Sequence, residues 1–321
     1  MNNAWLMRLP VGLFAVPVGL FALAGAWRRA EAFGWEIALP ISSALGELSA
    51  VLLALLMTLY AAKAIRHTSN VSAEFTHPLI GSLFALIPLS LMLCSVHFGQ
   101  AHNTGWLTFT LLALTLQGVI ALRVVALLAT GKLHAVAVTP ALYLPPVAGG
   151  FVGALAMHSL GYPGWAGLLF GMGLASWALL EARVLNSLFE GPLPEALRPT
   201  IGVELAPPSV ATLVAASLWP SLPGEVLIVG LGVAAGPLVA VMARWSWWSK
   251  VPFSIGFWSF SFPVGALAGA VIEVVRRGHW PALVGGIALA MASSVILFLA
   301  VRTVILALQG RLLPSAPVQR S

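Results

Sequence analysis

The sequence predicts an all-α polytopic membrane protein with ten transmembrane helices. Three observations support this fold class. Of the 321 residues, 60% are hydrophobic and only 8% are charged, and the acidic residues are all glutamates. Apolar runs of about 20 residues, the length that a helix needs to cross a bilayer, recur along the whole chain. These runs do not alternate apolar with polar residues, as the strands of a membrane β-barrel would.

The apolar segments follow one another through short connections, so we expect a single membrane channel domain over residues 1–321. The predicted helices cover residues 11–27, 44–65, 79–98, 106–130, 141–160, 165–186, 203–219, 226–243, 254–275 and 283–308. The first is interpreted as a retained helix rather than a signal peptide, because no clear small-residue cleavage site follows it. Residues 309–321 are predicted to form a disordered cytoplasmic tail.

Basic residues predict the orientation of the chain. Of the 16 Lys and Arg residues, all but Arg28, Arg29, Arg276 and Arg277 lie toward the ends of even segments or before odd ones. The positive-inside rule then places both termini in the cytoplasm. These charges are scattered singly and form no basic stripe, so membrane lipids are expected as partners and nucleic acid is not.

Proline divides the segments into two kinds. Every odd-numbered segment has an interior proline, whereas among the even ones only the eighth does, at Pro237; the odd-segment prolines are Pro17, Pro88, Pro145, Pro146, Pro207, Pro208 and Pro263. Proline bends a helix and removes a hydrogen bond, which a membrane protein tolerates inside the protein or beside a water-filled cavity. We therefore predict five hairpins, with the kinked odd helices in a quasi-five-fold ring around a central pore and the even helices facing lipid.

The ninth segment predicts the wall and the gate of that pore. Phe262 shares one helical face with Ser259, Gly265, Ala266 and Gly269, so this face is small everywhere except for one ring. We expect these residues to line the pore and Phe262 to close it, because an aromatic ring blocks a narrow apolar conduit by its size and by dewetting. The alternative for each small residue is close helix packing.

Ionisable residues give no catalytic constellation. Glu47, Glu181 and Glu204 lie within or at the edge of apolar segments, where a carboxylate is a candidate for coupling transport; the alternative is a structural pair with an arginine or a helix N-terminus. Cys94 is the single cysteine, and the histidines lack ligand spacing, so neither a metal site nor a cofactor is expected. No nucleotide-binding loop or nucleophile elbow occurs, and an enzyme is not predicted.

Motifs in the odd segments resemble one family. They include LPVGLFAVPVGL in the first segment, TPALYLPPVAGGFVGAL in the fifth, LRPTIGVELAPP entering the seventh and FWSFSFPVGALA in the ninth. From Leu9 to Gln309 the chain resembles TehA and its relatives, the tellurite-resistance and dicarboxylate transporter family that is homologous to plant slow-type (SLAC) anion channels. The resemblance implies ten helices around a quasi-five-fold pore, a homotrimer with one pore in each protomer, and the bacterial plasma (inner) membrane.

The same resemblance assigns residues to the pore. The occluding phenylalanine of the family falls on Phe262, and Pro263 follows it where bacterial members often carry glycine. The motif in the first segment places Phe14 and Ala15 beside Pro17, near the pore wall.

Three functions from different classes remain open at this point. The first is an anion channel that conducts chloride or nitrate through a neutral pore. The second is a secondary transporter of C4-dicarboxylates or tellurium oxyanions, with or without proton coupling, which should place an ionisable group at mid-membrane. The third is a membrane scaffold or receptor subunit with a partner at its cytoplasmic loops, although proline-broken helices would then have little reason to recur five times around no cavity.

Overall fold

The computed structural model describes residues 4–131, 138–190 and 193–313, and these are helical apart from short connections. Within them, ten helical spans are long and apolar enough to cross a membrane. The predicted fold class, an all-α polytopic membrane protein, is confirmed. Of the predicted tail, residues 314–321 lie outside the described residues.

Each odd span changes its winding partway along. A 3₁₀ or π segment leads into an α-helix in every case. The pairs are η1 (Val11–Phe14) with α2 (Ala15–Ala30), η3 (Ile80–Ala85) with α5 (Leu86–Phe98), η5 (Pro140–Tyr143) and the π segment η6 (Leu144–Ala148) with α7 (Gly149–Ser159), η7 (Glu195–Leu205) with α9 (Ala206–Leu218), and η8 (Ile255–Phe260) with α12 (Ser261–Arg277).

The prolines lie at these changes of winding. Pro17, Pro88, Pro208 and Pro263 are each the third residue of the α-helical part, and Pro146 is the third residue of η6. A proline ring crowds the carbonyl four residues before it and offers no N–H. In four of the odd spans the preceding turns take the tighter 3₁₀ winding, whose hydrogen bonds span three residues, and in the other a π segment follows the 3₁₀ turn. What the sequence predicts as simple kinks are thus junctions between two kinds of helix.

The even spans are continuous α-helices on the outside of the bundle. They are α3 (Ala38–Arg66), α6 (Thr104–Ala129), α8 (Pro163–Glu190), α10 (Gly224–Ala243) and α13 (Ala282–Leu308). In the most apolar stretch of each even span only 17–28% of residues are buried, against 61–94% in the odd spans. Apolar side chains exposed on the outer helices suit a lipid environment.

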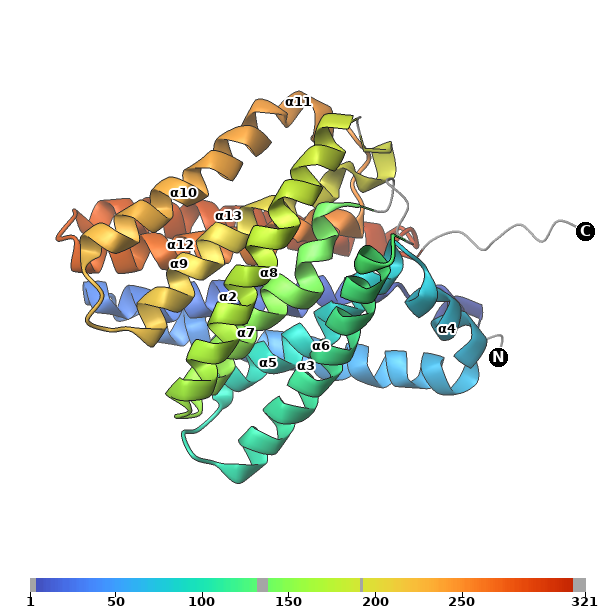
Figure 1. Cartoon of the computed structure of the whole chain (residues 1–321), viewed down its shortest axis with the longest axis horizontal. Helices are drawn as coiled ribbons and strands as arrows, with labels where there is room; N and C mark the ends of the chain where they lie inside the picture. Colours follow the sequence, from blue (N-terminus) through green and yellow to red (C-terminus); the bar gives the residue numbers. More distant parts are fainter. Residues whose placement is uncertain (1–3, 132–137, 191–192, 314–321) are drawn as a thin grey trace, which may run out of the picture.

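The inner helices pack in a closed sequence of neighbours. Helix α2 contacts α5, α5 contacts α7, α7 contacts α9, α9 contacts α12, and α12 returns to α2. Figure 1 shows α2 and α12 side by side along the longest axis of the molecule. We call the end where the odd spans begin the near end, and the end where they finish the far end. The quasi-five-fold symmetry of this arrangement stays a prediction.

Polar side chains of the outer helices satisfy carbonyl groups at the junctions. Gln117 of α6 donates from Nε2 to the carbonyls of Leu144 and Pro145, at 3.0 and 2.7 Å. Ser49 of α3 donates to the carbonyl of Pro17 at 2.8 Å. These bonds tie two outer helices to the inner spans beside the junctions, where the regular winding changes.

The contact between α7 and α8 leaves no room for a side chain at Gly150. A Cβ there would lie 2.7 Å from the backbone Cα and N of Gly173 and 2.9 Å from the carbonyl oxygen of Leu169. These backbone atoms can move only if helix α8 moves as a whole. We therefore expect Gly150→Val to destabilise the protein by about 3 kcal/mol or to prevent folding. Thermal unfolding in detergent measures this. The control is Gly167→Val, at an α8 position with open space around it; equal stability of the two variants would contradict the prediction.

Candidate functional site

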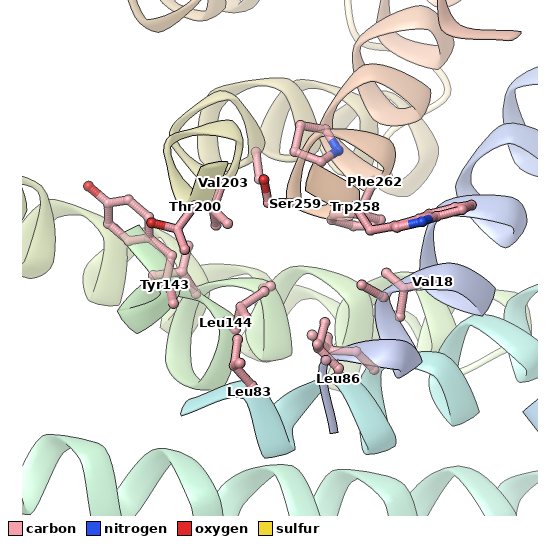
Figure 2. A pocket seen from close by; sticks show the side chains of 18 of the residues that line it. Val18, Leu83, Leu86, Tyr143, Leu144, Thr200, Val203, Trp258, Ser259 and Phe262 are labelled. Atoms are coloured by element: carbon pink, nitrogen blue, oxygen red, sulfur yellow. The ribbon is translucent and has the colours of Figure 1, made fainter. Parts of the chain in front are cut away.

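A cavity of about 120 Å³ lies between the odd spans, in the half of the bundle toward the near end. All of its lining residues belong to odd spans, and all five odd spans contribute. Among them are Gly12, Ala15, Val18, Leu83, Leu86, Leu89, Tyr143, Leu144, Val147, Thr200, Val203, Ala206, Pro207, Trp258, Ser259, Phe262 and Pro263. In Figure 2 the labelled side chains surround an open space.

The wall of this cavity is mostly apolar. None of the described residues that line it carries a formal charge. Its hydroxyl groups donate to the protein: Tyr143 to Oε2 of Glu181 at 2.7 Å, Thr200 to the carbonyl of Leu197 at 2.7 Å, and Ser259 to that of Pro199 at 2.5 Å. The cavity can therefore hold several waters, or a small anion that has lost part of its hydration, with no fixed charge to trap it.

Part of the predicted pore wall lies at the cavity. Phe262 is partly buried near the start of α12 and lines the cavity together with Ser259 and Pro263. Ala15 lines the same cavity from α2, the helix that packs against α12. The structure therefore brings the predicted gate and two of its predicted neighbours together.

Phe14 lies outside the cavity wall. Its side chain is 1% exposed, and its ring packs edge-on against Tyr60 of α3, with the ring centroids 5.9 Å apart. The 3₁₀ winding of η1 turns this residue toward the outer helix while Ala15 faces the cavity.

Gly265, Ala266 and Gly269 also lie outside the wall of the cavity. They continue along α12 toward the far end, where the inner helices close on one another. A Cβ at Gly265 would lie 2.9 Å from that of Ala22 in α2, and one at Gly269 would lie 3.1 Å from Leu213 in α9. At these positions the small residues serve close helix packing, the alternative that the sequence leaves open.

Two of the three membrane carboxylates are held at the near end. Glu204 is buried and forms an ion pair with Arg244 of α10 at 2.8 Å, which is the structural pairing that the sequence offers as an alternative. Glu181 accepts hydrogen bonds from the Tyr143 hydroxyl and the Trp177 indole, both at 2.7 Å. Its partners are thus neutral donors.

Glu47 lies apart from both of these carboxylates. It is exposed on the outer face of α3, within the apolar stretch of an even span.

Several residues that line the cavity could not be predicted from the sequence. Tyr143, Thr200 and Leu83 belong to the 3₁₀ segments, and the pattern of prolines and glycines gives no reason to single them out. Their shared signal is position, because each precedes the proline junction of its span.

Comparisons with known proteins identify the family of this chain. The family described as SLAC1, voltage-dependent anion channel, matches residues 8–306. The tellurite resistance protein TehA homolog of Haemophilus influenzae is 29% identical over 276 residues, which cover 84% of this chain and 82% of that protein. Since the match extends over all ten spans, the chain belongs to the SLAC1 family of voltage-dependent anion channels.

Proposed function

We propose that the protein is a channel that conducts small monovalent anions, such as chloride and nitrate, through a neutral pore between the odd spans. The observation that carries the proposal is the uncharged, mainly apolar cavity with walls from all five odd spans. Family membership supports anions as the class of solute.

The neutral wall accounts for the choice of anion. An ion that enters the cavity exchanges part of its water for an apolar surface with few polar groups, which costs least for large, weakly hydrated anions. The hydroxyl groups of Thr200 and Ser259 can rotate to donate to a passing ion. The net charge of +6 raises the local concentration of anions and lowers that of cations.

Phe262 is the gate in this proposal. Its ring stands at the cavity at the start of α12, and the next residues along the same face are Gly265, Ala266 and Gly269. In the closed state that we propose, the ring obstructs the path, and a change of rotamer would move it aside.

The proposal includes the assembly and the membrane. The closed order of contacts among the inner helices supports a quasi-five-fold ring. The excess of Lys and Arg at the near end supports a cytoplasmic location for both termini. The resemblance to TehA supports a homotrimer in the bacterial plasma membrane.

Reconstitution tests the function directly. Purified protein in liposomes is given an anion gradient, and efflux of chloride or nitrate is followed with a selective electrode. We expect flux above that of empty liposomes, stronger for nitrate than for sulfate, with no accompanying potassium flux. If folded protein, inserted into the liposomes in both orientations, gives no more flux than empty liposomes, the protein is not a channel. The scaffold would then be the remaining hypothesis.

A secondary transporter is the alternative that one contact favours. Tyr143 lines the cavity and its hydroxyl, which points away from the open space, donates to Glu181, so the side chain of Tyr143 links a carboxylate to the cavity wall. In a carrier of C4-dicarboxylates or tellurium oxyanions, this pair would pass protons.

The variant Glu181→Gln separates the two functions. As a channel, the protein should show anion flux that does not depend on a proton gradient in either form. Saturable flux that follows the proton gradient in the wild type, and loses that dependence in Glu181→Gln, would establish the carrier. Glu204→Gln is the matched control, because its partner Arg244 lies away from the cavity wall.

A further inference from the structure

Arginines gather around one carboxylate at the far end of the bundle. Glu273 of α12 lies 2.7 Å from Nη2 of Arg276, 3.2 Å from Nη2 of Arg277 and 3.5 Å from Nε of Arg29 in α2. Arg29 also donates from Nη2 to the hydroxyl of Ser217 in α9, at 2.9 Å. One carboxylate thus faces three guanidinium groups, and positive charge is in excess.

These groups lie on the same helical faces as the cavity. Arg29 follows Val18 by eleven residues, Ser217 follows Ala206 by eleven, and Glu273 follows Phe262 by eleven. Eleven residues are about three α-helical turns, so each pair shares a face, with the second member roughly 16 Å further along. Because the first member of each pair lines the cavity, three inward faces lead from the cavity to the cluster.

Helix capping explains only part of this cluster. Arg277 donates to the carbonyls of Ala216, Trp219 and Leu222, which satisfies the end of α9. Arg28 similarly donates to the carbonyl of His97 at the end of α5.

Arg29 and Arg276 are directed differently. Arg29 donates to the carbonyl of Gly25 in its own helix, whereas its buried Nε makes no hydrogen bond within the described structure and faces the Glu273 carboxylate at 3.5 Å. Arg276 reaches Glu273 and is half exposed. The other carboxylates at this end, Glu31, Glu36 and Glu225, are exposed.

We propose that Arg29, Arg276 and Ser217 form an anion-binding site at the far mouth of the pore, and that the Glu273 carboxylate occupies it as a tethered competitor. The inference rests on the proposed function. A carboxylate and a nitrate ion both present planar oxygen acceptors that match the guanidinium fork, and chloride accepts the same N–H groups. An arriving anion takes the place of Glu273 on Arg29, so the site concentrates anions at the mouth without trapping them.

Glu273→Gln tests the competition, since it keeps the shape of the side chain and removes its charge. Nitrate flux is compared in a Phe262→Ala background, where the gate does not limit it. A tethered group competes at an effective concentration in the millimolar range or above, so we expect the half-saturating nitrate concentration to fall about tenfold. In Arg29→Gln it should rise by a similar factor. Glu225→Gln, which removes an exposed charge at the same end, should leave the half-saturating nitrate concentration unchanged.

A second measurement does not depend on transport. Nitrate should raise the melting temperature of purified protein in detergent, more so in Glu273→Gln and not at all in Arg29→Gln, with Arg29→Lys as the variant that keeps the charge if Arg29→Gln does not fold. Equal effects of Glu273→Gln and Glu225→Gln, or a nitrate shift that persists without Arg29, would overturn the site. Absence of flux in the Phe262→Ala background would instead refute the channel, while the melting shift still decides on the site.

Discussion

Replacement of Phe262 by alanine is expected to raise anion conductance by at least about an order of magnitude, because removal of about 1.4 kcal/mol from a barrier speeds passage tenfold. The ring is the largest side chain that α12 contributes to the cavity, and the residues beyond it on that face are small. Without the ring, the cavity would be wider at the position where we propose that the pore is closed. Voltage-clamp recording in oocytes or planar bilayers, with chloride and then nitrate, measures the change.

The control for this experiment is Phe298→Ala. Phe298 is 57% exposed on the outer helix α13, so its loss removes an equal ring from the lipid-facing surface. Its currents should match those of the wild type. If Phe262→Ala reaches the membrane in normal amounts and its currents are unchanged, Phe262 is not the gate.

Loss of Glu74 is expected to destabilise the near end by about 3–5 kcal/mol, the cost of leaving a buried charge without its partner. Lys63 is fully buried at the end of α3; its Nζ donates to Oε1 of Glu74 at 2.6 Å and to the carbonyl of Leu9 at 2.7 Å. The Tyr60 hydroxyl donates to the other oxygen of Glu74 at 2.9 Å. The pair joins α3 to the short helix α4 (Thr68–Thr76) and to the chain just before η1.

Thermal unfolding of Glu74→Ala in detergent, followed by tryptophan fluorescence, tests this expectation. Glu36→Ala removes an exposed carboxylate and should leave the melting temperature unchanged. The double variant Lys63→Met with Glu74→Leu should recover most of the loss, because it removes both charges together. A double variant as unstable as Glu74→Ala would show that packing, rather than the unpaired ammonium, causes the effect.

The alternation of inner and outer helices could be predicted because it is encoded locally. Pro17, Pro88 and Pro263 each mark an odd span, and a proline in a membrane helix requires shelter from lipid. The change from 3₁₀ to α winding could not be read in this way, since proline is compatible with either a kink or a junction. Gly265 was equally ambiguous, because a glycine permits both a pore wall and a close helix contact.

The far-end cluster could not be predicted because its members are distant in the sequence. Arg29 and Glu273 are more than 240 residues apart, and only the contact between α2 and α12 joins them. In the sequence, Arg29, Arg276 and Arg277 stand out only as basic residues on the side that the positive-inside rule leaves poor in positive charge. The Tyr143 contact with Glu181 is hidden for the same reason, since it links η5 to α8.

The junctions in the odd spans also have a consequence for the side chains that surround the cavity. A 3₁₀ turn rises about 2.0 Å per residue and an α turn about 1.5 Å, with roughly 120° and 100° of rotation. When one residue at a junction changes from one winding to the other, the rest of the helix therefore moves by about half an ångström along its axis and rotates by about 20°. Four such junctions surround the cavity, and in the remaining odd span the π segment η6 lies between the 3₁₀ turn and α7. We expect that a shift of one residue between the two windings would turn the side chains that line the cavity while each helix keeps its neighbours.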